Sequence, residues 1–252
     1  MNRSYWNRIG RRYRGEIFSV RHEDRTGLVE NWIRAEGSVR RRAGDFGCGT
    51  GHFTGVLAES FGRVQALDLS DSLLAQAVLR HRHQSHVEFY RVDLTQPLRA
   101  LPRVDFGLCV NVLIMADAGL RQCLLEQVAA LLRPRGRLLV VVPALESVFL
   151  AQQRLIEWHR RDGLPLRQAV AQRMPAFQPS ALRGLPEGLV QIDGVPTKHY
   201  TADELELELA RHGLVPQKTA RVEYGWHTEF EKPPRWMRKP YPWDWAVLAR
   251  KA

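Results

Sequence analysis

Cysteine is scarce in this chain of 252 residues, and the three cysteines present do not form recognisable pairs. Cys48, Cys109 and Cys123 are odd in number and lack C-x-x-C spacing, so the sequence indicates neither a disulfide framework nor a zinc site. The histidines between positions 81 and 86 do not share one helix face, which argues against a metal site built from them. We expect no metal ion, and the cysteine usage favours a reducing cytoplasm.

Long apolar runs are absent as well. No stretch approaches the roughly 18 apolar residues of a membrane-spanning helix, and residues 1–6 lack the apolar core of a signal peptide. These absences predict a soluble, cytoplasmic protein with no membrane partner. The hydrophobic content of 44% is enough for the core of one large α/β domain or of two small ones, and we favour one domain with additions.

Acidic residues are few near the N-terminus, where most of the net charge of +10 lies. Residues 1–42 contain 11 arginines and 5 acids (net +6), residues 43–143 contain 10 basic and 9 acidic residues (net +1), and residues 144–252 contain 16 and 13 (net +3). A basic arm can attract an anionic partner such as nucleic acid. An arginine-rich, solvated helix face explains the same composition, and the sequence leaves both interpretations open.

The same arm carries aromatic side chains at nearly helical spacing. Tyr5, Trp6, Ile9 and Tyr13 predict an amphipathic helix over residues 3–15. This helix either packs on the main domain or closes over a ligand as a lid, and the two roles are compatible.

Two common nucleotide-binding signatures are missing from the glycine-rich stretch at residues 45–51. A dinucleotide fingerprint, G-x-G-x-x-G, would need its last glycine at position 52, which is His52. A phosphate-binding P-loop would need Gly-Lys followed by Ser or Thr, and no such element follows Gly51. What remains is D-x-G-x-G-x-G, whose glycines let the backbone turn sharply and approach a ligand closely.

Short apolar segments that we interpret as parallel strands lead to polar residues at regular intervals. One of them ends in Asp68, which lies 17 residues beyond Gly51. A carboxylate at that place can accept hydrogen bonds from both ribose hydroxyls of an adenosine-type ligand. Asp93 and Asn111 follow the next two strands, at the edge where open α/β sheets bind ligands. The strands are predicted at residues 42–46, 64–68, 87–92, 104–110 and 137–143.

The glycine motif, followed by Asp68 and Asp93 at successive strand ends, resembles the class I S-adenosylmethionine (SAM) methyltransferases. The resemblance covers about residues 43–143 and 199–250 and implies SAM as the cofactor. It also implies that Asp93 binds the adenine amino group. The cofactor-binding residues expected on this basis are Asp45, Gly47, Cys48, Gly49, Gly51, Asp68, Leu69, Asp93, Leu94 and Asn111.

The chain departs from the family pattern after the fourth strand. Family members often have an acid and a histidine there, whereas this chain has Ile114 and Met115. The departure favours an apolar floor beneath the methyl donor. The chain also lacks the Asn-Pro-Pro-Tyr or Asp-Pro-Pro-Tyr motif that many amino-directed nucleic-acid methyltransferases carry at this point.

The predicted fold is α/β, with a seven-stranded, mostly parallel, Rossmann-like methyltransferase sheet that has helices on both faces and an antiparallel edge. Residues 1–42 are expected to form an N-terminal helical arm, and residues 43–252 the methyltransferase domain. Within this domain, residues 144–198 contain a helical run and five prolines but no clear strand, which predicts an inserted substrate cover. The last two strands are predicted at residues 214–222 and 246–248.

Methyl transfer needs a nucleophile about 3 Å from the methyl carbon and in line with the departing sulfur. A hydroxyl or ammonium nucleophile also needs a proton acceptor. The candidates at the sheet edge are His199, Tyr200 and Asn111, of which we assign His199 and Tyr200 as the catalytic residues.

The function that we expect is methyl transfer to an O or N nucleophile of a small molecule such as a metabolite or natural product. The first alternative is an RNA or other nucleic-acid methyltransferase that uses the basic arm. The second is a non-catalytic module that binds SAM and serves in an interaction. The sequence does not define the oligomeric state.

Overall fold

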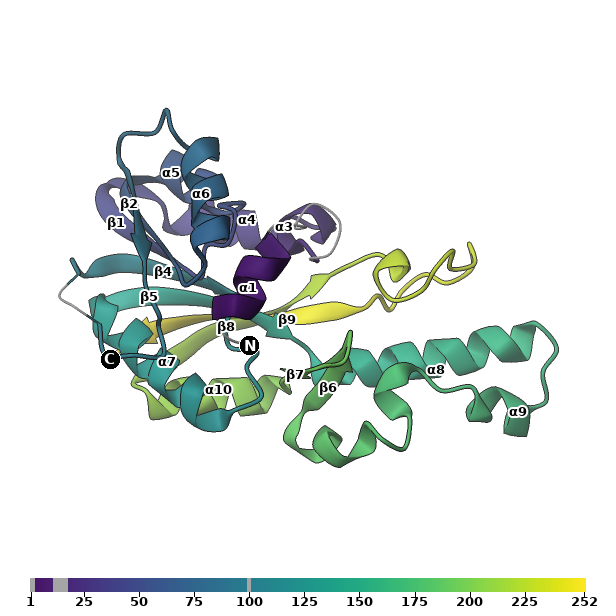
Figure 1. The fold of residues 1–252 in the computed structure, drawn as a ribbon. Coiled ribbons are helices and arrows are strands. Elements are labelled where there is room, and N and C mark those ends of the chain that lie inside the picture. Colours follow the sequence, from purple (N-terminus) through teal and green to yellow (C-terminus); the bar gives the residue numbers. More distant parts are fainter. Residues whose placement is uncertain (1–2, 11–17, 99–100) are drawn as a thin grey trace.

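The computed structural model describes residues 3–10, 18–98 and 101–252, and its centre is a twisted seven-stranded sheet (Figure 1). The strand order is β3-β2-β1-β4-β5-β9-β8. The strands are β1 (Ser38–Phe46), β2 (Phe61–Asp68), β3 (Val87–Arg91), β4 (Val104–Val110), β5 (Leu132–Pro143), β8 (Leu214–Glu223) and β9 (Trp243–Lys251). β1 to β5 pair in parallel, and β9 runs antiparallel to both of its neighbours, β5 and β8. The fold class predicted from the sequence is confirmed.

Helices cover both faces of this sheet, and each face has its own apolar core (Figure 1). On one face, α4 and α5 contribute Ile33 and Leu57 to the core; on the other, α7 and α10 contribute Leu125 and Leu209. All four of these side chains are at most 1% exposed. The helices are α1 (Arg3–Gly10), α3 (Val20–Glu23), α4 (Leu28–Glu36), α5 (Thr54–Ser60), α6 (Asp71–Arg80), α7 (Ala118–Leu131), α8 (Leu145–Arg161), α9 (Leu166–Ala171) and α10 (Ala202–Arg211).

The predicted elements are present, with shifted ends. β1 begins at Ser38 and β5 at Leu132, earlier than predicted. The N-terminal ends of both strands extend beyond the run of buried apolar residues by which the sequence pattern detects a strand. The last strand is longer than the predicted 246–248, and it is inserted between β5 and β8, so that β8 forms the edge of the sheet. The helix after Thr201 begins as its capping box predicts, since the Thr201 side chain accepts a hydrogen bond from the backbone of Glu204.

Residues 144–198, which we expected to lack strands, contain a β-hairpin, and that expectation is wrong. The hairpin consists of β6 (Leu189–Ile192) and β7 (Val195–Lys198), joined by Asp193 and Gly194. Both of these turn residues have positive φ (49° and 77°), as a type I′ turn requires. The remainder of the segment is α8, α9 and two 3₁₀ helices, η1 (Pro175–Phe177) and η2 (Leu182–Glu187). Figure 1 shows α8 and α9 extending away from the sheet, beside the hairpin.

The N-terminal arm contains helices α1, α3 and α4. Tyr13 and the arginines at positions 11, 12 and 14, which contribute to the aromatic and basic pattern of the arm, lie outside the described residues. Within the described ranges, no helix combines the length and apolar character needed to cross a bilayer. In the same part of the chain, no cluster of three His, Cys, Asp or Glu side chains is arranged to hold a metal ion.

Candidate active site

The glycine loop after β1 adopts a conformation that only glycine adopts easily. Gly47, Gly49 and Gly51 have φ values of 75°, 55° and 78°, in the left-handed region. The backbone amides of Gly47 and Cys48 both donate to the carbonyl oxygen of Leu67, at 2.8 and 2.9 Å, which ties the loop to the end of β2. The loop therefore turns sharply at the carboxyl edge of the sheet.

Two of these glycines also lie where a side chain would collide with its neighbours. A Cβ at Gly47 would stand 2.4 Å from Val112 Cγ2, and one at Gly51 would stand 2.8 Å from His81 Nε2. His81 is buried, and its Nε2 donates to the carbonyl oxygen of Gly51 over 2.8 Å. The sequence pattern explains this histidine only as a residue suited to a helix C-terminus. Its role in holding the loop depends on a contact between residues 30 positions apart, which no local pattern reveals.

Asp68 lies at the end of β2 with its carboxylate against the glycine loop. Its two oxygens accept hydrogen bonds of 2.8 Å from the backbone amides of Gly49 and Ser70. Burial raises the pKa of this carboxyl, and the hydrogen bonds from these backbone amides oppose the rise. Asp68 lines the cavity described below, in the place expected for a ribose-binding acid.

Asp45 and Asp93 occupy the ends of β1 and β3. Asp45 is buried and accepts a 2.6 Å hydrogen bond from the hydroxyl of Thr54. Its burial raises the pKa to about 7, because desolvation outweighs that hydrogen bond, and the nearby charge of Asp68 adds to the rise. Asp93 uses Oδ1 to accept hydrogen bonds from the backbone and side chain of Thr95, at 2.9 and 2.6 Å. Both carboxylates line the same cavity.

Asn111 follows β4 and contains a buried acceptor with no partner. Its φ is 54°, and its backbone amide donates to the carbonyl oxygen of Val141 over 2.9 Å. The side-chain Oδ1 is buried and has no hydrogen-bond partner among the described residues. An unsatisfied buried acceptor costs about 1–3 kcal/mol, so a bound molecule with an N–H or O–H group would stabilise this position.

These residues line a cavity of about 1530 Å³ at the carboxyl edge of the sheet. A site for one small molecule typically occupies about 300–1,000 Å³, so the cavity has room for a cofactor and a second molecule. Of the expected cofactor-binding residues, Gly51 shapes the loop without lining the cavity. The lining residues among them are Asp45, Gly47, Cys48, Gly49, Asp68, Leu69, Asp93, Leu94 and Asn111.

The polar groups at this edge of the sheet fit SAM. Three carboxylates, a glycine loop that leaves backbone open to a ligand, and the unsatisfied Asn111 Oδ1 match a ligand with ribose hydroxyls, an adenine amino group and an α-amino group. The loop offers no room for a Cβ at Gly47. The residues present are therefore compatible with the cofactor that the sequence implies.

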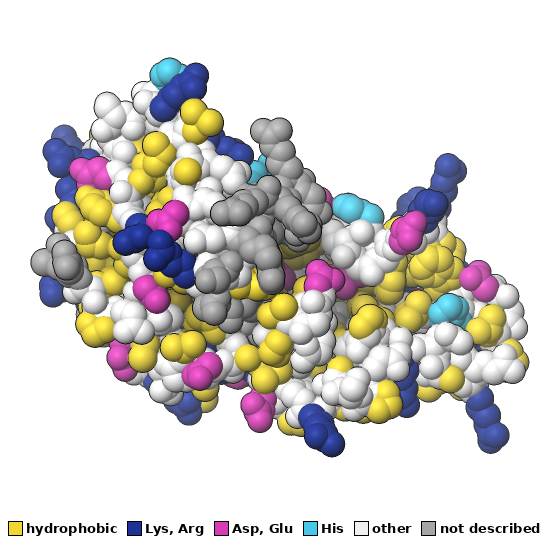
Figure 2. Space-filling model, in the orientation of Figure 1, with side chains coloured by type: hydrophobic (Ala, Val, Ile, Leu, Met, Phe, Trp, Pro, Cys, Tyr) yellow, Lys and Arg dark blue, Asp and Glu magenta, His cyan; other side chains and the backbone are white. Residues whose placement is uncertain are grey.

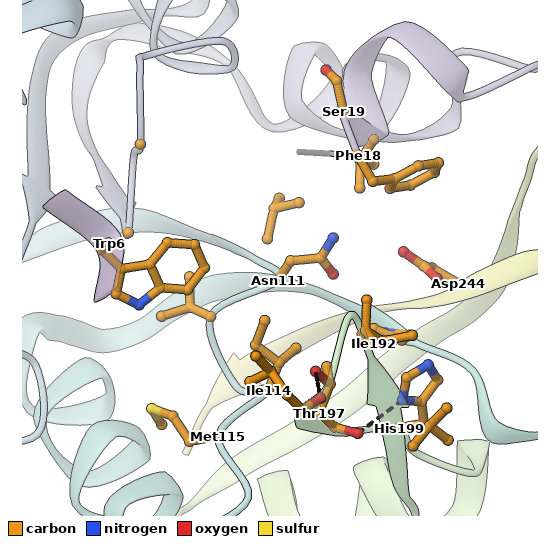
Figure 3. A pocket seen from close by; sticks show the side chains of 18 of the residues that line it. Trp6, Phe18, Ser19, Asn111, Ile114, Met115, Ile192, Thr197, His199 and Asp244 are labelled. Carbon is orange, nitrogen blue, oxygen red and sulfur yellow. Dashed lines mark hydrogen bonds between the residues drawn. The ribbon is translucent and has the colours of Figure 1, made fainter. Parts of the chain in front are cut away.

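Helix α1 lies over the cofactor side of the cavity. Asn7 Oδ1 accepts a 2.7 Å hydrogen bond from the hydroxyl of Ser70, and Arg3 forms an ion pair with Asp71. Trp6 lines the cavity and appears at its border in Figure 3. The arm thus contacts the residues that follow Asp68, an arrangement that suits both packing on the domain and a lid.

The β6–β7 hairpin forms the opposite wall. The backbone amide of Lys198 donates to the carbonyl oxygen of Ile114 over 2.9 Å, and Met115 and Thr197 form a bridge, so the hairpin is joined to the segment after β4. Ile114, Met115 and Ile192 line the cavity, and Figure 3 shows them along its lower border. The apolar floor that the departure at Ile114 and Met115 favours is present beside the hairpin.

The two catalytic residues predicted from the sequence lie in different surroundings. His199 lines the cavity, and its Nδ1 lies 3.0 Å from the carbonyl oxygen of Thr197. Nδ1 must therefore carry the proton, which leaves Nε2 as an acceptor. Burial lowers the pKa of His199 to about 4, so the ring is neutral at pH 7.

Tyr200 does not reach the cavity. It is fully buried in the core, and its hydroxyl donates to the carbonyl oxygen of Leu113 over 3.0 Å. The alternation of side chains along an extended segment places His199 and Tyr200 on opposite sides. A side chain enclosed in this way does not contact a molecule in the cavity, so the structure does not support Tyr200 as a catalytic residue.

Sequence reasoning missed Asp244, which lies in β9. This carboxylate is 7% exposed, lines the cavity, and accepts a 2.8 Å hydrogen bond from the hydroxyl of Tyr224. Burial raises its pKa to about 7; the Tyr224 hydrogen bond lowers the pKa, and the charge of Glu229 raises it. In Figure 3, the Asp244 carboxylate and the Asn111 amide point toward one another across the cavity.

Comparison with known proteins agrees with this geometry. Residues 44–136 match the methyltransferase domain family. No curated protein matches the chain. The fold is similar to that of 1,6-didemethyltoxoflavin-N1-methyltransferase from Burkholderia thailandensis, with a TM-score of 0.65, 19% identity, and coverage of 99% of this chain and 87% of that one.

Two other solved structures have the same fold. Magnesium protoporphyrin IX methyltransferase from Synechocystis has a TM-score of 0.60 and 17% identity, covering 99% of this chain and 97% of that one. A SAM-dependent methyltransferase from Mesorhizobium loti has a TM-score of 0.64 and 19% identity, covering 92% and 98%. The family match, the sheet order and the carboxylates at successive strand ends together show that residues 44–136 match a methyltransferase domain and that the chain has the Rossmann-like fold of the class I, SAM-dependent methyltransferases.

Proposed function

We propose that this enzyme transfers the methyl group of SAM to an N or O nucleophile of a small molecule. The observation that carries the proposal is the size and lining of the cavity. The cavity of about 1530 Å³ extends from the cofactor loops to the side where Asp244 lies, which we call the chamber. The walls of the cavity are mostly apolar, and the Asp244 carboxylate in the chamber is buried. Pockets for small molecules are concave and largely apolar, with a few fixed polar groups.

The chain's own residues would share the work as follows. Asp68 and Asp93 would hold the ribose and the adenine, and Ile114 and Met115 would form the floor of the chamber. SAM supplies an electrophilic methyl carbon on a sulfonium sulfur. Because methyl transfer needs an oriented substrate and no covalent enzyme intermediate, the main contribution of the protein is to position the two reactants.

Asp244 would accept the proton of the nucleophile, since a general base works best with a pKa near the operating pH. His199 Nε2 would accept a hydrogen bond that orients the substrate.

The names of two structural neighbours are in keeping with a small-molecule substrate. By these names, the two proteins act on 1,6-didemethyltoxoflavin and on magnesium protoporphyrin IX. On the face shown in Figure 2, the Lys and Arg side chains of the described residues are scattered over several elements, so this part of the surface offers the nucleic-acid alternative no single basic patch. A shift assay with RNA and DNA at two salt concentrations tests that alternative, since phosphate-driven binding falls steeply with salt. Binding at low salt that is lost at high salt would favour it.

Equilibrium binding of S-adenosylhomocysteine tests the cofactor half of the proposal. We expect saturable binding to the wild type and a loss of about 10- to 100-fold in Asp68→Ala, because hydrogen bonds to a charged group contribute about 1.5–3 kcal/mol. Asp162→Ala is the matched control, because Asp162 is exposed at the end of α8 and does not line the cavity. Absence of binding to the wild type, or equal binding by the Asp68 variant, would contradict the proposal.

Methyl transfer itself separates an enzyme from a non-catalytic SAM-binding module. Incubation with methyl-labelled SAM and a library of small amines and alcohols should give labelled products. Binding of S-adenosylhomocysteine with no labelled product from any acceptor would favour the module.

A further inference from the structure

The part of the cavity away from the cofactor loops is rich in carboxylates and has no unpaired cation among the described residues. Asp193, Glu229 and Asp244 line it. The described Lys and Arg residues that line the whole cavity are Arg3 and Arg21. Arg3 pairs with Asp71, and Arg21 pairs with Glu30 at 2.7 Å. The guanidinium groups of these two residues of the N-terminal arm therefore already have carboxylate partners. The carboxyl groups of the chamber therefore have no described cation beside them to stabilise their ionised forms.

Asp244 and Glu229 repel one another within this chamber. The Tyr224 hydroxyl donates to Asp244 Oδ2, while the nearby charge of Glu229 makes the ionised form of Asp244 less favourable. Like charges in a partly dry site are costly unless a cation lies between them. A ligand that brings a positive charge would remove this cost.

One further side chain presents an acceptor to the same space. His199 is 7% exposed, its Nδ1 is engaged by the Thr197 carbonyl, and no described residue hydrogen-bonds to its Nε2. An acceptor that faces a cavity without a partner suits a ligand with an N–H donor. Asn111, whose unsatisfied Oδ1 is expected to meet the cofactor, points toward Asp244 in Figure 3, so the expected cofactor site and this space adjoin.

Aromatic rings surround the same carboxylate. Phe18 and Tyr224 meet edge to face with their centroids 4.7 Å apart, and Trp243 precedes Asp244 in β9. All three line the cavity. Aromatic faces attract cations by about 0.5–2 kcal/mol. The Arg221 guanidinium already lies 4.1 Å from the centroid of the Trp243 ring, so we assign the attraction of a ligand cation to Phe18 and Tyr224. The buried indole Nε1 of Trp243 has no partner among the residues that the structure describes, and as a donor it suits an uncharged oxygen elsewhere on the ligand.

We propose that the methyl acceptor is a small molecule that binds as a protonated amine between Asp244 and Glu229, and that its nitrogen is the atom methylated. The inference rests on the proposed function and narrows its substrate class to amines. The ammonium proton moves to the Asp244 carboxylate, which leaves a nitrogen lone pair. That lone pair forms the N–C bond while the C–S bond breaks and its electron pair returns to sulfur, so the positive charge passes from sulfur to the methylated nitrogen.

Matched acceptors of opposite charge test the inference. The probes are three amine and carboxylate pairs that share a phenyl, an indole or a naphthyl ring, for example tryptamine and indole-3-propionate. Their dissociation constants are measured by calorimetry on protein saturated with S-adenosylhomocysteine. We expect at least one amine to bind about tenfold or more tightly than its carboxylate, a difference of about 1.4 kcal/mol.

Two variants identify the groups responsible. Asp244→Asn should bring the preference for the amine to within about twofold. Glu231→Gln is the control and should leave the preference unchanged, because the Glu231 side chain is 90% exposed and lies outside the cavity.

Each outcome bears on the inference. Equal or tighter binding of the carboxylates, no binding of any probe at about 10 mM, or an unchanged preference in Asp244→Asn would overturn it. The binding of S-adenosylhomocysteine is measured first in every sample. If the wild type does not bind S-adenosylhomocysteine, the proposed function fails. If the wild type binds S-adenosylhomocysteine but shows no preference for amines, the amine assignment alone fails.

Discussion

Asp244 is a buried carboxylate that still faces a cavity, and its surroundings set its pKa. Burial raises the pKa to about 7, the hydrogen bond from Tyr224 lowers it, and the charge of Glu229 raises it further. A carboxylate with these properties changes its protonation state at the pH where most enzymes work. It can therefore serve as a proton acceptor, which an exposed aspartate with a pKa near 4 does less well.

The pH dependence of kcat/KM for the acceptor should report this group in the free enzyme. In the wild type we expect kcat/KM to rise with pH and to reach half of its maximum near pH 7, because the carboxylate must be ionised to accept a proton. Tyr224→Phe removes the hydrogen bond that lowers the pKa, so its midpoint should move upward by about 0.5–1 pH unit. The measurement is the initial rate of methyl transfer between about pH 5.5 and 9, at saturating SAM and at acceptor concentrations well below the KM. An unchanged midpoint in Tyr224→Phe would contradict the role of Asp244.

The β6–β7 hairpin illustrates what local patterns reveal about an element and what they conceal. Asp193 and Gly194 between two short β-prone segments are a strong signal of a type I′ turn. The prolines of the segment, including Pro196 within β7, favour an irregular cover when the sequence is considered alone. A proline is tolerated here because the hairpin is an isolated two-stranded sheet, in which every strand is an edge strand.

Loosening the hairpin turn should weaken binding of the acceptor and leave the cofactor unaffected. Gly194 has a φ of 77° and an open surrounding, so Gly194→Ala strains the turn by about 1 kcal/mol without a collision. We expect the KM of the acceptor to rise several-fold, while the Kd of S-adenosylhomocysteine stays within about twofold.

Gly163→Ala provides the matched control. Gly163 has a φ of 94°, and a Cβ added there would meet no atom within 4 Å, but this glycine lies at the end of α8 and does not line the cavity. This variant should lose similar stability and keep both constants. Equal changes in the KM of the two variants would show that the hairpin has no special part in binding the acceptor.

On the scale of the whole molecule, the cavity opens where the carboxyl ends of the parallel strands meet β9 and the hairpin. Two buried acids at this edge, Asp45 and Asp244, have pKa values raised to about 7. The folded protein therefore holds protons on these groups that the unfolded chain would release. Such groups oppose folding when they are ionised, and an active site commonly carries this cost in stability.

The variant Asp244→Asn should be more stable than the wild type at alkaline pH. Because the folded-state pKa lies above the unfolded value, stability from the protonated carboxyl is fully present below about pH 4 and is lost as the pH rises through about 7. Asparagine does not titrate and can still accept the Tyr224 hydrogen bond. We expect a gain of about 1–4 kcal/mol in the free energy of unfolding at about pH 8, and little or none at about pH 4.5. Denaturant titrations at both pH values measure it, and a gain that is equal at the two would refute this account.

The sequence by itself determined which residues meet at the expected cofactor side of the cavity. The glycine loop, Asp68, Asp93 and Asn111 lie at or just beyond the ends of β1, β2, β3 and β4, and parallel strands bring their carboxyl ends to one edge whatever the details of packing. Local pattern and strand spacing were therefore sufficient to place them together.

Only the tertiary structure decided which residues line the proposed acceptor side. Phe18 belongs to the N-terminal arm and His199 to the segment after the hairpin, while Tyr224 follows β8 and Asp244 lies in β9. They line one cavity because β9 is inserted between β5 and β8. The burial of Tyr200 likewise depends on which side of the extended segment at residues 199–200 faces the core. Contacts of this kind depend on long-range packing and on the path of long connections, which are not encoded in a short stretch of sequence.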